Sequence, residues 1–98
     1  RLLGALAATP DGPQGSLLDN TVILWTTETA TGARHRLDDY PLVLIAGKNT
    51  GIKQGGHHVA VNGRSMNDFL TSLIRVFGLP QTSFGSVRYN REPIDIFA

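Results

Sequence analysis

A glutamate and a histidine follow the first strongly apolar stretch of this sequence. Glu28 comes just after that stretch, which spans residues 21–25, and His35 follows a few residues later. Carboxylate and imidazole groups bind divalent metals such as zinc, and they also act as general acids and bases. The pair is therefore a candidate metal site, although its spacing matches no short metal-binding motif. The alternative is that Glu28 caps a loop and His35 lies in a solvated turn.

Three other groups of residues could carry chemistry, but each has a simpler structural explanation. His57 and His58 are adjacent, so on a strand they would point to opposite faces and could not easily ligate one ion. Residues 47–56 are rich in glycine but lack the GxxxxGK[ST] pattern of a phosphate loop, which favours turns. Asp38 and Asp39 precede a Tyr-Pro pair, which favours a turn over paired catalytic carboxylates. Chain order alone identifies no serine, histidine and acid triad.

Two apolar stretches are predicted to form the strands that position these side chains. Residues 21–25 and residues 42–46 are apolar or β-branched and do not alternate with polar residues. This pattern is typical of strands covered on both faces in a parallel or mixed sheet, so we expect Trp25 in the core. Ligands of open α/β sheets collect beyond the carboxyl ends of the strands, which is where Glu28 stands.

Two helices are predicted. The first ends near residue 8, where prolines and glycines follow. The second is expected over residues 66–77, with Ser65 as its N-cap and Gly78 just after its end. Apolar residues recur along it at helical spacing, as in a helix that packs on a core. They are Phe69, Leu70, Leu73, Ile74 and Phe77.

The remaining residues are predicted to form an edge β-hairpin and a tail. Residues 57–63 follow a glycine-bearing turn and alternate weakly, as an exposed edge strand does. Apolar side chains in residues 81–98 indicate a tail that packs down. Residues 1–98 thus form a single α/β segment. We expect it to be the C-terminal portion of a larger domain, because two strands buried on both faces need more cover than two helices provide. In addition, the first residues resemble the end of a longer helix.

Composition narrows the possible classes of protein. The 98 residues include nine Lys and Arg and eight Asp and Glu, and no block of like charge occurs, so no nucleic-acid partner is expected. Cysteine is absent from the sequence, which removes disulfides and thiolate metal sites. The apolar runs are far shorter than the roughly 20 residues of a membrane-spanning helix.

Several stretches resemble one protein family in their order and spacing. They are residues 17–25, 43–47, 67–73 and 77–80, together with Gly32, His35, Pro41, Gly55, Gly56, Phe84 and Gly85. In combination they are similar to the C-terminal region of a secreted bacterial family, domain of unknown function 1552. That family is more distantly similar to the alkaline phosphatase and sulfatase superfamily. The resemblance extends over nearly the whole chain.

The resemblance implies a fold, a location and a site. The fold would be the C-terminal part of an alkaline-phosphatase-like mixed sheet with flanking helices and an edge β-hairpin, and the protein would be secreted or periplasmic. In the superfamily a strand similar to residues 21–25 is followed by a Thr-Ser-Asp-His-Gly segment with metal-binding Asp and His. Here Glu28 stands in for the carboxylate and Thr29 replaces the histidine. His35 matches the first histidine of a Gly-x-x-His-x-His segment, whereas Leu37 replaces the second.

These matches imply a segment of a metal-dependent phosphate or sulfate ester hydrolase, in which Glu28 and His35 bind a divalent metal such as zinc. The nucleophile of the superfamily lies outside this chain. The replacements at Thr29 and Leu37 favour the alternative of a non-catalytic secreted structural or binding protein. A third possibility is a subunit of an envelope or filament assembly. In each case the expected partners are the rest of the parent polypeptide or other protein chains.

Overall fold

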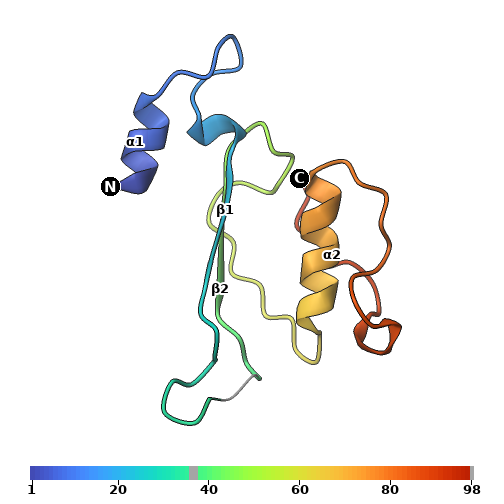
Figure 1. Ribbon diagram of the computed structural model, residues 1–98. Helices are drawn as coiled ribbons and strands as arrows, with labels where there is room; N and C mark the ends of the chain where they lie inside the picture. Colours follow the sequence, from blue (N-terminus) through green and yellow to red (C-terminus); the bar gives the residue numbers. More distant parts are fainter. Residues whose placement is uncertain (36–37, 98) are drawn as a thin grey trace. The chain divides into compact units, whose positions relative to one another are not determined.

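The computed structural model describes residues 1–35 and 38–97, and it divides into two compact units, Arg1–Thr50 and Gly51–Ala98 (Figure 1). The first unit contains α1 (Leu2–Ala8), the short 3-10 helix η1 (Leu18–Asn20), and strands β1 (Val22–Thr26) and β2 (Leu42–Ala46). The second contains α2 (Met66–Val76) and the 3-10 helix η2 (Val87–Tyr89). Helices and strands thus both occur, as predicted. Within the described ranges, none of the helices is long and apolar enough to span a membrane.

Strands β1 and β2 form an antiparallel pair in which Trp25 lies opposite Val43. Because successive side chains alternate between faces, this pair shares a face with Ile23 and its partner Ile45. We call these four residues the Trp25 face. Trp25 is 69% exposed and Val43 is 48% exposed, so the core position predicted for Trp25 is wrong. The described residues contain two strands of this sheet and no third. Apolar residues in a strand do not specify which element packs on the strand.

The end of β2 is fixed by close backbone approach at Gly47. This residue is buried, and its N–H donates a hydrogen bond to the Thr21 carbonyl at 2.9 Å. A Cβ here would collide with the backbone carbonyls of Leu18 and Asp19 in η1. Glycine is therefore required where β2 passes η1. The Asn49 N–H then donates to the Asp19 carbonyl at 2.9 Å, which continues the contact beyond the strand.

Helix α2 begins as the sequence predicts, but it buries a different set of residues. The Ser65 hydroxyl accepts a hydrogen bond from the Asp68 N–H, which confirms the predicted N-cap. Phe69 is buried as expected, whereas Phe77 follows the end of the helix and is 70% exposed, so its predicted core position is wrong. The fully buried neighbours of Phe69 are polar. They are Asp68, Thr71 and Ser72.

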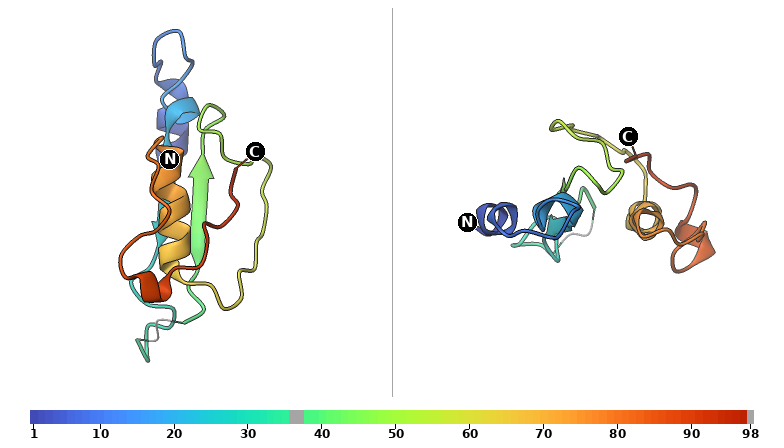
Figure 2. Two further views of the ribbon diagram at one scale, coloured as in Figure 1. Left: turned by 90° about the vertical axis from the view of Figure 1, so that its right-hand side faces the viewer. Right: turned by 90° about the horizontal axis from the view of Figure 1, so that it is seen from above.

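The C-terminal tail packs against its own unit, as predicted, and it explains why α2 buries polar side chains. After η2 the chain runs back along α2 (Figures 1 and 2). The Ser72 hydroxyl donates to the Ile94 carbonyl at 2.7 Å. Near the end of the tail, Phe97 forms an antiparallel bridge with Ile52, and Ile52 is 6% exposed.

The predicted edge β-hairpin does not form. Residues 57–63 are exposed and contain no strand. The N–H of Lys53 bonds instead to the Ile96 carbonyl at 2.9 Å, so the backbone pairing of this region goes to the tail. Weak alternation of apolar residues shows that a segment is able to pair, but it does not identify the partner.

Candidate functional site

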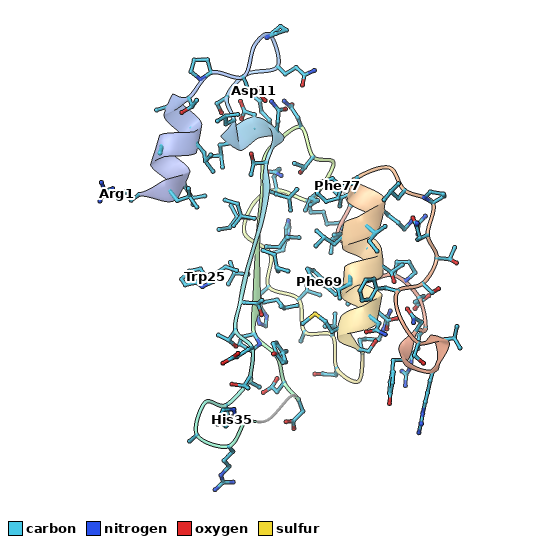
Figure 3. All side chains as sticks on the ribbon, viewed as in Figure 1. Arg1, Asp11, Trp25, His35, Phe69 and Phe77 are labelled. Carbon is cyan, nitrogen blue, oxygen red and sulfur yellow. The ribbon has the colours of Figure 1, made fainter. Side chains whose placement is uncertain are left out.

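The two predicted metal ligands both lie on the connection between β1 and β2. Glu28 follows β1 closely and is exposed. His35 is exposed in a turn, where its φ of 48° is a left-handed conformation that side-chain-bearing residues adopt rarely. Figure 3 shows His35 in the loop that connects the end of β1 to the start of β2. Leu37, the position that replaces the second histidine, lies outside the described residues. The loop thus presents both candidate ligands to solvent.

A zinc site needs three or four protein ligands. In residues 1–35 and 38–97, no group of three or more His, Cys, Asp or Glu side chains is placed to hold a metal ion. Glu28 and His35 could therefore supply at most part of a ligand set, and the described residues do not complete it. The site predicted from these two residues stays a prediction.

The other histidines are placed in the irregular segment of the second unit. The His57 Nε2 lies 2.8 Å from the Gln54 carbonyl and closes a local turn. His58 is exposed beside it. Asp39, one of the two adjacent carboxylates, has a φ of 55°, in agreement with the turn that was favoured over a paired catalytic site.

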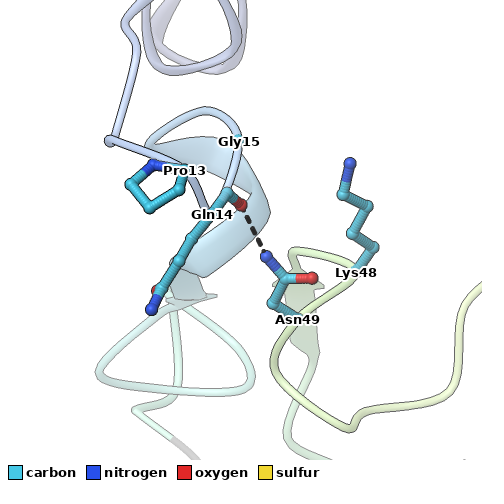
Figure 4. Close-up of a pocket in the computed structure, with 5 residues that line it drawn as sticks. All are labelled: Pro13, Gln14, Gly15, Lys48 and Asn49. Carbon is cyan, nitrogen blue, oxygen red and sulfur yellow. Dashed lines mark hydrogen bonds between the residues drawn. The ribbon is translucent and has the colours of Figure 1, made fainter.

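An open depression of about 490 Å³ lies in the first unit between residues 13–15 and residues 48–49 (Figure 4). The amide of Asn49 donates hydrogen bonds to the Gln14 carbonyl and to Asn20 Oδ1, both at 2.8 Å. The amide of Asn20 in turn donates to Asp11 Oδ2 at 2.8 Å. These amides hold the two loops together, so the polar groups of the depression have a structural role.

Asp19 stabilises the same region from η1. Its carboxylate accepts a hydrogen bond from the Ser16 N–H at 3.0 Å and pairs with Lys48 Nζ at 3.2 Å. The pKa of Asp19 lies below its usual value, because the Ser16 N–H first and the Lys48 ammonium next favour the charged form. The sequence suggested only a turn at this position. The Ser16-x-x-Asp19 spacing of a capping box could have indicated the Ser16 contact, whereas the ion pair with Lys48 joins separate loops and has no local signal.

The second unit contains a buried carboxylate that sequence reasoning missed. Asp68 is 1% exposed, and it accepts hydrogen bonds from Arg64 Nε and from the Arg91 N–H, both at 2.8 Å. Burial raises the pKa of Asp68, but the hydrogen bonds from Arg91 and Arg64 outweigh that effect, so the pKa lies below its usual value. The signal that could have found it is the spacing Ser-x-x-Asp from Ser65, which resembles a capping box.

The contacts of Asp68 join the start of α2 to the tail. The Arg64 guanidinium also bonds to the Glu92 carbonyl and lies 3.7 Å from the Glu92 carboxylate. The Ser65 hydroxyl donates to the Tyr89 carbonyl. We call Arg64, Ser65 and Asp68, with their partners in residues 89–92, the Asp68 cluster. Its hydrogen bonds and ion pairs hold the start of α2 to the tail, which gives the cluster a structural role.

The Trp25 face is an exposed apolar surface on the strand pair. In Figure 3 the Trp25 side chain points away from the strand pair into open space. Its cross-strand neighbour Val43 is also exposed, so the Trp25 face carries adjacent apolar groups on a regular surface. No family model, no curated protein and no solved structure matches this chain. The functional assignment therefore depends on the residues of the chain itself.

Proposed function

We propose that this chain is a non-catalytic interaction segment of a larger secreted α/β protein of the domain of unknown function 1552 type, in the C-terminal part of an alkaline-phosphatase-like sheet. In this proposal the rest of the polypeptide or another protein chain covers the Trp25 face. The supporting observation is the exposure of Trp25 and Val43 at 69% and 48% on a paired strand surface. Aromatic residues that stand exposed on a regular surface are typical of interfaces.

The exposed area of the chain supports a missing partner. The chain exposes 7215 Å². A compact protein of this mass exposes about 5500 Å², and two separate compact units of half the mass expose about 6600 Å² together. Any contact between the two units would lower the exposed area of the chain, so the excess over the second figure is a lower bound for the separate units. Covering the exposed part of Trp25 alone would contribute about 4 kcal/mol.

The single tryptophan of the chain gives a direct test. We expect the purified chain to associate with rising concentration in sedimentation velocity, with a parallel blue shift of Trp25 fluorescence as water leaves the indole. Val43→Ser should weaken association and keep the emission of Trp25 close to that of exposed tryptophan. Val59→Ser is the matched control, because Val59 is 61% exposed but lies in the irregular segment of the second unit. A monomer at all concentrations with water-exposed tryptophan emission would rule out a second copy of this chain as the cover of the Trp25 face, and an equally exposed Trp25 in the full-length protein would contradict the proposal.

A second proposal is that Glu28 and His35 contribute to a divalent metal site of a phosphate or sulfate ester hydrolase, such as a zinc site, completed by residues of the larger protein. The observation that favours it is that both side chains are exposed on one loop beyond β1, where a second protein surface can reach them. Metal analysis of the full-length protein tests it. Glu28→Gln and His35→Asn should each lower the bound metal, and His58→Asn should not. Equal metal content in all three variants would rule out this role.

The proposed location, secreted or periplasmic, follows from the resemblance to the exported bacterial family. Fractionation of cells that carry the tagged full-length gene tests it. We expect the tag in the periplasm or the medium, and recovery of the tag in the cytoplasm alone would contradict an exported protein.

A further inference from the structure

One asparagine of this chain combines a reactive sequence with an exposed turn. Among five asparagines, Asn62 is the one that glycine follows. The Arg64 N–H donates to the Val61 carbonyl at 3.1 Å, so residues 61–64 form a β-turn with Asn62 and Gly63 at its centre. Gly63 has a φ of 70°, whereas the φ of Asn62 is not positive, which is the pattern of a type II turn. Both central residues are exposed.

The two groups that would react are free of competing contacts. In the described part of the chain, neither the Asn62 side-chain amide nor the Gly63 N–H takes part in a hydrogen bond. Apart from Gly63 and its two chain neighbours, no atom lies within 4 Å of the position that a Cβ would occupy on Gly63, so no other segment crowds this residue. A single backbone hydrogen bond holds the turn, which leaves the Asn62 side chain able to rotate toward that nitrogen.

Other asparagine amides of the chain are held in place. Those of Asn20 and Asn49 belong to the network that joins the loops of the first unit. The amide of Asn90 donates to the carbonyls of Phe84 and Ser86, at 2.8 Å and 2.7 Å. A side chain held by such bonds must break them before it can reach the backbone nitrogen of the next residue.

We propose that Asn62 is a site of spontaneous deamidation that proceeds in the folded protein. The Gly63 nitrogen loses its proton and attacks Cγ of Asn62, which forms a new C–N bond and closes a five-membered succinimide. The bond from Cγ to the side-chain nitrogen breaks, and that nitrogen takes up a proton and leaves as ammonia. Water then adds to either ring carbonyl and opens the ring to aspartate or isoaspartate. The net reaction converts an amide and water into a carboxylate and ammonium.

The product would alter the Asp68 cluster. It carries a new negative charge two residues before Arg64, whose guanidinium binds Asp68 and Glu92. The isoaspartate product also inserts a methylene into the backbone of the turn that leads to the N-cap Ser65. Modification at Asn62 therefore changes charge and chain geometry at the point where α2 is joined to the tail.

Timed incubation of the purified chain at mildly alkaline pH, followed by proteolysis and mass spectrometry, tests the proposal. We expect the peptide that contains Asn62 to gain the mass of an amide-to-acid conversion and to separate into aspartate and isoaspartate forms. Asn20, Asn49 and Asn90 should remain amides. Asn62→Gln should abolish the conversion, because its longer side chain closes a six-membered ring far more slowly.

The same incubation in urea shows whether the fold permits the reaction. We expect the folded and unfolded chains to convert at Asn62 at rates within an order of magnitude of each other. A folded rate more than an order of magnitude below the unfolded rate would overturn the proposal, because the turn would then protect the residue. Conversion of Asn49 as fast as Asn62 in the folded chain would also overturn it, since hydrogen bonding would then not distinguish the two.

Discussion

Replacing Asp68 with asparagine should destabilise the second unit strongly, although the change preserves the size of the side chain. The carboxylate is 1% exposed and accepts hydrogen bonds from the Arg64 guanidinium and the Arg91 N–H. An amide has one oxygen instead of two and carries no charge. Asp68→Asn therefore loses a charged acceptor and leaves Arg64 without its nearest counterion.

The size of the loss follows from the contacts. A hydrogen bond to a charged group contributes about 1.5 to 3 kcal/mol, and removing one partner of a fully buried ion pair costs about 3 to 5 kcal/mol. The Arg64 side chain is 20% exposed, so water compensates for part of the lost pairing. We expect Asp68→Asn to lower the free energy of unfolding by about 3 kcal/mol, toward the lower end of the range for a buried pair.

Urea unfolding followed by circular dichroism measures this loss. With a slope of about 1.5 kcal/mol per molar, the midpoint should fall by about 2 M, and a larger loss would appear as an unfolded spectrum without urea. Asp95→Asn is the matched control, because its ion pair with Lys53 lies in the same unit but its side chain is 77% exposed. Equal midpoints for Asp68→Asn and the unchanged chain, or equal shifts for both variants, would refute the reasoning.

The contribution of Asp68 should also depend on pH. Its pKa in the folded chain lies below the ordinary value of 3.8, so the folded state favours the charged form. A depressed pKa contributes stability that is fully present well above 3.8 and is lost as pH falls through the folded pKa. The difference in stability between the unchanged chain and Asp68→Asn should therefore be constant near neutral pH and shrink in acid. A difference that grows as pH falls would contradict this sign.

Two further substitutions test the local structure by urea unfolding. Gly47→Ala should lower the free energy of unfolding by about 1 to 3 kcal/mol, because the new methyl group would meet the carbonyls of Leu18 and Asp19. Gly4→Ala in α1 is the control and should be neutral or stabilising, because nothing is found within 4 Å of its new methyl group. A similar loss of stability in both variants would rule out the steric cause. Ser65→Ala should lower the free energy of unfolding by about 1 kcal/mol, because it removes the N-cap of α2. An unchanged urea midpoint would show that the cap contributes nothing to stability.

Features that depend on neighbouring residues could be predicted from the sequence. A Ser N-cap and apolar residues at helical spacing predicted the start of α2, because a cap and a helix turn are made within a few positions of each other. Continuous β-branched and apolar residues predicted β1 and β2 close to their observed bounds. Glu28 and His35 were correctly placed in a loop after the first strand, and a metal role for them stays a prediction.

The contacts of each element with distant parts of the chain became visible only in the folded structure. The sequence pattern of β1 suggested cover on both faces, yet Trp25 is exposed. The antiparallel partner β2 pairs beside β1 in the same sheet and does not cover its face. Residues 57–63 alternate as a strand does, but the neighbouring Lys53 pairs with the tail. The buried Asp68 carboxylate is compensated by the N–H of Arg91, which lies far along the chain. Such pairings depend on the path of the backbone through space, which local residue patterns do not specify.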